Sequence, residues 1–391
     1  MAKRKVYLHI GPPGPASDAI HRGLLQHRFA LAGLGFHVPT TTPYDALAAE
    51  VELRRTHRDH GLKRREVEGT WARLTREAWK SERAVLLSVP GLAAGSADVA
   101  ALALDALAGL QVHLVVTPSD PGTAVTSAWA AAVQHGRATS FAKFARRVLD
   151  PERNHDQAQE FWATHDLVRV LDIWAGRLKP ERVHVVTVPP AGADADPHDR
   201  PGDVLAWERF GAVLGVDLPP APEPTGRHLA ETGARRDPRA EHTAAAAQIA
   251  LLRRVNRSLD GRLAHPSYAP VVGELFGDIA PLALPDLAPD PRTAPLAGLL
   301  TEIGGRWVAT LAERGYAVHG RSHDLLPVAP TVPDHPDDVG SRAQLEVATD
   351  VLAETLLELA RVRREHDRLA AEHAALAEKR VRLRRRLAGV S

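Results

Sequence analysis

Residues 5–18 read KVYLHIGPPGPASD, and this stretch decides the fold class. The run KVYLHI is short, β-branched and aromatic, which is typical of a buried strand, and Gly-Pro-Pro-Gly ends it. Ser17 or Asp18 is predicted to cap a helix that continues to about Leu31. A strand, a glycine loop and a helix in this order open a βαβ unit.

Three more apolar runs occur further along the chain: AVLLSV at 84–89, VHLVVT at 112–117 and VHVVTV at 183–188. They are continuous rather than alternating, as in strands that are buried on both faces. Helices are predicted before them and after them, including 98–107, 165–178 and 244–259. Four strands separated by helices predict an α/β fold with a doubly wound, mainly parallel sheet.

Stretches rich in Pro, Gly and Asp interrupt this pattern at residues 189–203, 219–240 and 280–296. We interpret them as long surface loops. A last such stretch separates the globular part from the tail. The predicted organisation is therefore a domain over residues 1–327, a linker over 328–341 and a helix over 342–388.

The tail carries a seven-residue apolar repeat. One series is Leu345, Leu352 and Leu359; the other, three positions later in the heptad, is Val362, Leu369, Leu376 and Leu383. This pattern predicts a coiled coil, although His366, His373 and Arg380 occupy positions of the first series and weaken its second half. The helix would be about 70 Å long, whereas the radius of gyration of the domain would be about 20 Å. A helix of this length would extend beyond a single domain. We therefore expect a homo-oligomer or a coiled-coil partner; the alternative is a helix packed on its own domain.

Composition limits the function classes. The chain has 391 residues, a formal net charge of +1 and no cysteine, so we expect no nucleic-acid partner, no disulfide and no thiolate metal site. No apolar run is long enough for a transmembrane segment, and the first residues lack a secretory signal, so we expect a cytoplasmic protein. Arginine outnumbers lysine and alanine is abundant, which favours a bacterial, GC-rich source.

The end of the tail is locally basic, with Lys379, Arg380, Arg382, Arg384, Arg385 and Arg386. A solvated helix end that interacts with the helix dipole explains these residues. An anionic lipid or nucleic acid remains the alternative. No aromatic residue is interleaved with them, which argues against stacking on single-stranded bases.

The loop after the first strand is placed to bind phosphate. Backbone N–H groups and the positive end of the following helix attract an anion there. However, the loop contains no lysine followed by serine or threonine, so it is not the loop of a nucleoside-triphosphate-binding protein. A kinase or nucleotidase is therefore disfavoured.

The chain from KVYLHI to GLGFHVP resembles the opening of bacterial P-loop sulfotransferases, whose loop reads Gly-x-Pro-Lys-Thr-Gly-Thr-Thr. VHLVVTPSDPGTAVTSAWAAAVQHGR resembles their second donor motif, and later segments up to GYAVHGRSHDLLP extend the resemblance over residues 4–327. It implies a three-layer α/β/α fold and the donor 3′-phosphoadenosine 5′-phosphosulfate. It also implies these donor-binding positions: Gly11, Pro13, Gly14, Ala16, Ser17, Asp18, Ser119 and Ser127.

Several of these positions depart from the family pattern. Gly14 stands in place of the lysine, Pro15 of a threonine, Asp18 of another threonine, and Ser119 of the arginine for the 3′-phosphate. A hydrogen bond to a charged group contributes about 1.5–3 kcal/mol, so losing both cations weakens donor binding by about 3–6 kcal/mol, roughly 10²–10⁴-fold. The resemblance thus implies a degenerate site and no tightly bound cofactor.

Two functions follow. The first is an inactive sulfotransferase-like protein that acts as a binding or scaffold protein and self-associates through its tail. The alternative is an active enzyme that transfers a sulfuryl group to a hydroxyl acceptor, with Arg22 or Arg137 as replacement cations. No general base is assigned, because His113, His135 and His165 are more typical of structural histidines, and no metal site is predicted.

Overall fold

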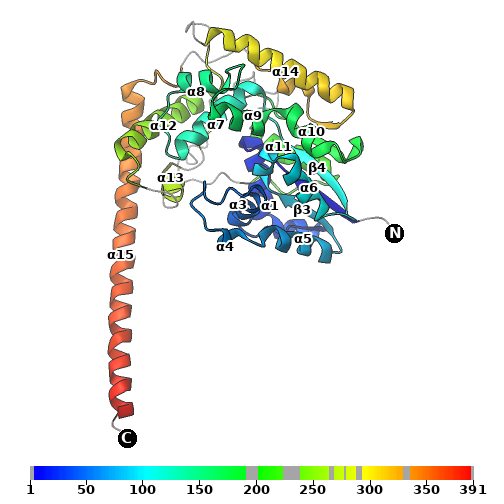
Figure 1. The fold of residues 1–391 in the computed structure, drawn as a ribbon. Helices are drawn as coiled ribbons and strands as arrows, with labels where there is room; N and C mark the ends of the chain where they lie inside the picture. The colour runs from blue at the N-terminus through cyan, green and yellow to red at the C-terminus, as the bar shows by residue number, and fades with distance from the viewer. Residues whose placement is uncertain are drawn as a thin grey trace.

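The centre of the molecule is a six-stranded sheet in the order β2-β3-β1-β4-β5-β6, and every pair of neighbouring strands is parallel. It is seen in a computed structural model that describes residues 4–190, 201–222, 238–263, 268–276, 279–287, 293–328 and 335–388. Helices flank the sheet (Figure 1). The predicted α/β class with a mainly parallel sheet is confirmed.

The strands are β1 Lys5–His9, β2 Phe36–His37, β3 Ala84–Ser88, β4 Gln111–Val116, β5 Val183–Val186 and β6 Ala317–His319. Four of them are the predicted apolar runs. β2 and β6 are additional, and they form the two edges of the sheet. They have two and three residues, too few to display a pattern in the sequence.

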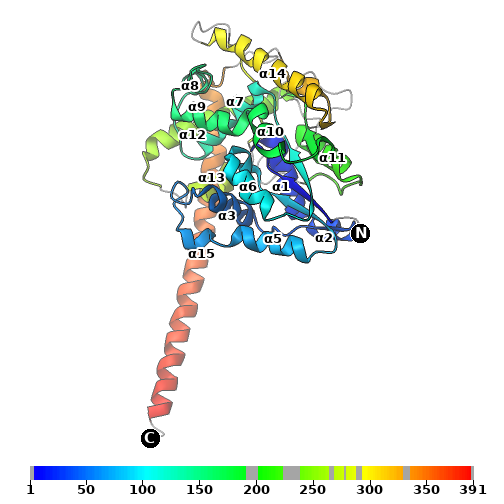
Figure 2. The ribbon, with the colours of Figure 1, turned by 45° about the vertical axis from the view of Figure 1, so that its right-hand side comes forward.

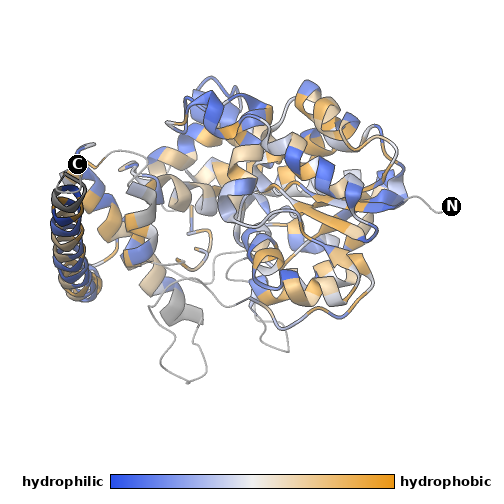
Figure 3. Ribbon diagram, turned by 90° about the horizontal axis from the view of Figure 1, so that it is seen from below, coloured by the Kyte–Doolittle hydropathy of each residue, from blue (hydrophilic) through white to orange (hydrophobic). Residues whose placement is uncertain are grey.

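Alternate residues of each strand face opposite layers. Tyr7 of β1 packs in one cluster with Ile20 and Trp207, from the helices α1 Pro15–Gln26 and α11 Gly202–Leu214. Val6 and Leu8 pack in the other, with residues of α5 Thr70–Lys80, α6 Ala97–Asp105 and α10 Leu167–Ala175. Figure 3 shows the hydrophobic strands enclosed between the two layers.

A group of helices packs beside the sheet and contributes to the same core. Its members are α7 Pro121–Gln134, α8 Phe141–Val148, α9 Asp156–His165, α12 Pro238–Leu259, α13 Tyr268–Phe276 and α14 Ala294–Arg314. Trp129 and Phe141 meet edge to face inside this group. Before the tail, the other described helices are α2 Arg28–Gly33, α3 Pro43–Arg54, α4 Arg64–Val67, η1 Pro90–Ala94, η2 Pro180–Arg182 and η3 Ser322–Leu325.

The first helix begins earlier than predicted. α1 starts at Pro15 with Gly14 as its N-cap residue, and a glycine has no side chain to form a cap hydrogen bond. The prediction of a cap at Ser17 or Asp18 is therefore wrong, because Pro15 fixes a helical φ at the first position. The helix is also interrupted at His27, after which α2 begins.

Part of the stretch 280–296 is buried, which corrects its interpretation as a surface loop. Within the described residues 279–287, Leu282 and Leu287 are buried. The hydroxyl of Thr126 on α7 donates a hydrogen bond of 2.8 Å to the Leu282 carbonyl. Leu284 lies beside Gly122 at the start of α7. The other two predicted loops fall largely outside the described residues.

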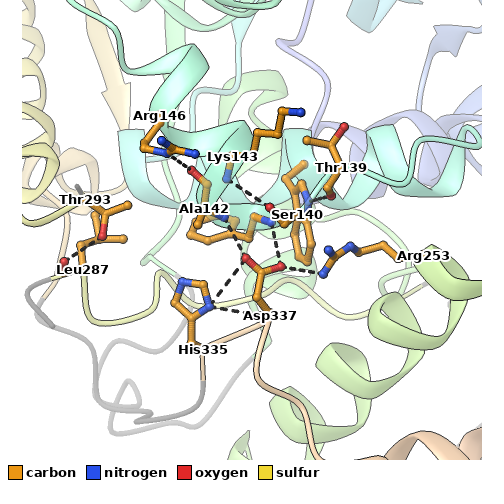
Figure 4. A network of polar contacts seen from close by, with 12 residues as sticks. Thr139, Ser140, Ala142, Lys143, Arg146, Arg253, Leu287, Thr293, His335 and Asp337 are labelled. Carbon is orange, nitrogen blue, oxygen red and sulfur yellow. Dashed lines mark hydrogen bonds and ion pairs between the residues drawn. The ribbon is translucent and has the colours of Figure 1, made fainter. Parts of the chain in front are cut away.

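Asp337, in the predicted linker, is bound to the domain (Figure 4). Its carboxylate accepts hydrogen bonds from the N–H groups of Phe141 and Ala142, at 2.9 and 3.0 Å, and pairs with Arg253 at 2.6 Å. Arg253 in turn lies over the Trp129 ring. These contacts attach the segment before the tail to α8 and α12.

The tail is a single helix, α15 Ser341–Ala388, of 48 residues. It packs against α12 and α13 near its start and then projects away from the domain (Figures 1 and 2). Most of its apolar side chains are exposed. Among the described helices, none is long and apolar enough to cross a membrane.

Candidate anion site at the centre of the sheet

The loops after β1 and β4 meet at one point of the sheet. β1 lies between β3 and β4, so the order of the strands reverses there. In open α/β sheets, ligands bind at such a point, beyond the carboxyl ends of the strands. The two loops are adjacent, because a Cβ added to Gly14 would lie 3.8 Å from Oγ of Ser119. The two sequence motifs are thus brought together.

The first loop is fixed to its neighbours. The Gly11 carbonyl accepts a hydrogen bond of 2.8 Å from the N–H of Thr117, and the Ile10 carbonyl one of 3.0 Å from Ala93. Gly11, Ala16 and Ser17 are buried, Gly14 is half-buried, and Pro13 and Asp18 are exposed. The accessible part of the loop is therefore Pro13 to Pro15 together with the Asp18 carboxylate.

This accessible part is poor in groups that bind anions. Three of the residues 11–15 are prolines, which have no N–H group to donate. No lysine or arginine occurs between Gly11 and Asp18. Asp18 lies in the first turn of α1, where a carboxylate stabilises the helix and repels a second anion. The loop has the position of a phosphate cradle but few of its donors.

A buried histidine lies beneath the loop. Nδ1 of His9 is 2.8 Å from Oγ of Ser88, and its Nε2 is 3.1 Å from Oγ1 of Thr117 and 3.3 Å from Oγ of Ser17. His21 of α1 also contacts Ser88, at 3.1 Å. The Ser17 hydroxyl, which the resemblance assigns to the donor, is therefore directed into the protein.

These histidines supply no positive charge at neutral pH. Burial lowers the pKa of His9 to about 3, and the neighbouring His21 shifts it in the same direction. Burial also lowers the pKa of His21. Sequence reasoning missed both residues, although His9 is the last residue of the strand that leads into the loop. That position alone would have placed it at the switch point of the sheet.

The second sequence motif, residues 112–137, contains a buried carboxylate at the start of α7. Asp120 is 2% exposed and accepts hydrogen bonds from the N–H groups of Gly122 and Thr123, at 2.9 and 3.1 Å. Burial raises the pKa of its carboxyl group to about 6. These are the N–H groups that would otherwise face an anionic ligand. Sequence reasoning did not single out Asp120, although an aspartate before a proline is a recognisable helix start.

The other residues of this motif lie at different distances from the loop. Ser119 is half-buried beside Gly14. Ser127 lies two turns along α7, about 10 Å from the helix start. Its Oγ is buried without a hydrogen-bond partner among the residues that the structure describes.

The two candidate replacement cations differ in their distance from the loop. Arg137 follows α7 at its far end, about 20 Å from Asp120, and is exposed. Arg22 is closer, one turn beyond Asp18 on α1. It is half-buried and already engaged by a neighbouring group.

The three histidines that were considered as bases have structural surroundings. His113 belongs to a row across the sheet, with its Nδ1 3.0 Å from Nε2 of His184, whose Nδ1 is 3.2 Å from Nε2 of His319. His135 bonds to the carbonyl of the preceding helical turn. His165 stacks on a phenylalanine ring. Burial lowers the pKa of His113, His165 and His184 to about 4.

No protein-family model and no curated protein matches the chain. Among solved structures, the sulfotransferase from Alicyclobacillus acidocaldarius is similar, with 18% sequence identity and a TM-score of 0.36. The match covers 65% of this chain and 96% of that chain.

Proposed function

We propose that this chain is a sulfotransferase-like protein whose donor site no longer supports catalysis. It acts as a binding or scaffold protein that self-associates through α15. The observation that carries the first part is that the anion-binding groups at the switch point are already used by the protein itself. Asp120 occupies the start of α7, and Ser17 is bonded to a neutral His9.

The missing charges act on both binding and chemistry. Each charged hydrogen bond to a phosphate contributes about 1.5–3 kcal/mol. A cation at the loop would also stabilise the charge that develops on the leaving oxygen during sulfuryl transfer. Gly14 and Ser119 supply neither, and Asp18 adds a negative charge at the entrance. The missing charges therefore weaken donor binding and also slow sulfuryl transfer.

The alternative is an active enzyme that uses 3′-phosphoadenosine 5′-phosphosulfate with replacement cations. It would depend on Arg22, which already interacts with another group, because Arg137 is too far along α7. The geometry therefore favours the first proposal.

Calorimetry with 3′-phosphoadenosine 5′-phosphate tests the donor site. The natural chain is expected to bind more weakly than about 100 µM, since two charged contacts are absent. The variant Ser119→Arg restores one charged contact and leaves the backbone of Gly14 unchanged, so it is expected to bind roughly 10–10²-fold more tightly. The matched control is Gly33→Lys, which adds a lysine on α2 where a Cβ meets nothing within 4 Å. Micromolar binding by the natural chain would overturn the proposal.

Light scattering tests the self-association. The full-length chain is expected to have at least twice the monomer mass of 42.2 kDa. The variant Leu352→Glu/Leu376→Glu places charges on the exposed apolar face of α15 and is expected to be monomeric. A monomeric natural chain at tens of micromolar contradicts this part of the proposal.

A further inference from the structure

Six leucines occupy the two apolar heptad positions of α15 and are 45–67% exposed: Leu345, Leu352, Leu359, Leu369, Leu376 and Leu383. Successive members are 7, 7, 10, 7 and 7 residues apart. The series therefore reads the same from either end, with its midpoint at residue 364. A contact between two identical chains across a two-fold axis needs a surface of this kind, because each half must match the other.

We infer that α15 pairs antiparallel with α15 of a second copy, with the two-fold axis at residue 364. The inference rests on the proposed self-association and specifies its geometry. Residues equally far from 364 then face each other. Leu345 meets Leu383 of the partner subunit, Leu352 meets the partner's Leu376, and Leu359 meets the partner's Leu369.

Polar residues also occur at the apolar heptad positions of α15, which form the seam between the two helices. They favour the antiparallel direction. In a parallel pair, His366, His373 and Arg380 would each face their own copy, which puts two arginines in one layer. In the antiparallel pair they face Val362, Thr355 and Ala348 of the other chain, none of which is cationic. Like charges that are held opposite each other are destabilising, so the antiparallel arrangement costs less.

The two halves of α15 also carry opposite charge. Residues 342–360 contain four acidic residues and one arginine, whereas residues 361–388 contain ten basic and four acidic residues. An antiparallel pair places each acidic half beside a basic half. A parallel pair places the two basic halves side by side. Complementary charge of this kind sets partner orientation in coiled coils.

The acidic residues that flank the seam are already neutralised within their own helix. Glu358 pairs with Arg361 and Glu365 with Arg368, each at 2.5 Å. Contact between equivalent glutamates near the axis is therefore weakly repulsive. The domain also leaves the apolar positions of α15 uncovered at the end of the helix that packs against it. Gln344 is buried against the domain, while the next residue, Leu345, is 67% exposed.

Disulfide trapping tests the direction and the register, because the chain has no cysteine of its own. The full-length variants Leu352→Cys and Leu376→Cys are oxidised separately and as a mixture. We expect each alone to stay unlinked and the mixture to give a linked dimer as its main product. Within one chain the two positions are about 36 Å apart, which excludes an internal disulfide. The control mixture is Ala353→Cys with Ala375→Cys, on the outward side of the helix.

The outcomes separate the two proposals. Linked dimers from each single variant alone would show a parallel pair and overturn the inference, while self-association stands. A dimeric chain with no linkage in any mixture would overturn the register. A natural chain that is monomeric by light scattering overturns the proposed self-association and the inference with it.

Discussion

Nε2 of His9 lies 3.3 Å from Oγ of Ser17, so that a buried imidazole engages the hydroxyl nearest to the loop. The same ring holds Ser88 and Thr117. It therefore joins three segments that are far apart in the sequence. These four side chains therefore contact one another inside the protein and link the segments that carry them.

Replacing His9 by leucine is expected to lower the free energy of unfolding by about 2–4 kcal/mol, because buried hydroxyls lose their partner. Urea unfolding followed by circular dichroism measures the change. The control is His135→Ala, at an exposed helix end, with an expected change below about 1 kcal/mol. Equal effects of the two variants would contradict a structural role for the His9 network.

The row of histidines across the sheet predicts acid lability. Burial holds the pKa of His113 and His184 at about 4 in the folded state, against an ordinary value of 6.5. The unfolded chain therefore takes up protons first as the pH falls below 6.5, and the folded state loses stability down to about pH 4. Between pH 7 and pH 5 the loss is about 1–2 kcal/mol for each histidine.

Urea titrations at both pH values measure this loss. The variant His113→Leu/His184→Leu is expected to show a shallower dependence of its stability on pH. His57→Leu/His60→Leu, in a surface segment between α3 and α4, serves as the matched control with an unchanged slope. A slope that both variants leave unaltered would rule out the row as its source.

Asp337 is predicted to be a strong attachment point for the tail. The variant Asp337→Asn removes the charge that faces Arg253, whose side chain is only 12% exposed. Breaking a buried pair on one side costs about 3–5 kcal/mol, so a large drop in thermal stability is expected. Ser140→Ala is the matched control, because it removes one ordinary cap bond to Lys143 at the same helix end. The cost there is about 1 kcal/mol.

Gly11 of the loop and Gly33 of α2 are predicted to tolerate a side chain very differently. A Cβ on Gly11 would lie 2.3 Å from the carbonyl oxygen of Pro90, and its φ of +88° favours glycine. A Cβ on Gly33 would meet nothing within 4 Å. Gly11→Ala is therefore expected to destabilise the chain by more than about 2 kcal/mol, and Gly33→Ala by less than about 1. Comparable melting temperatures for the two variants would argue against the described loop.

Local patterns predicted much of the fold because they act within one element. The four apolar runs became β1, β3, β4 and β5, and the heptad repeat predicted a long helix that appears as α15. The edge strands β2 and β6 were missed, since two or three residues show no period. The start of α1 was misplaced because Pro15 defines it and not a capping hydroxyl.

The features of the site also separate into those that the sequence predicted and those that it did not. The position of the site after β1 and the absence of lysine and arginine from the loop can be read from residues 11–18. The partners of those residues cannot be read from the sequence, because His9, Ser88 and Thr117 come from different parts of the sheet and meet only when the sheet forms. Burial by the same packing gives His9 and Asp120 their shifted pKa values.

The sequence by itself determined which segments are strands and helices, where the chain turns at the loop, and which charges that loop lacks. These properties depend on neighbouring residues, whose spacing is fixed by the covalent chain. Only the tertiary structure decided that Ser17 turns inward, that Asp120 fills the start of α7, and that the leucines of α15 stay uncovered. Each of these depends on which distant surfaces pack together and exclude water.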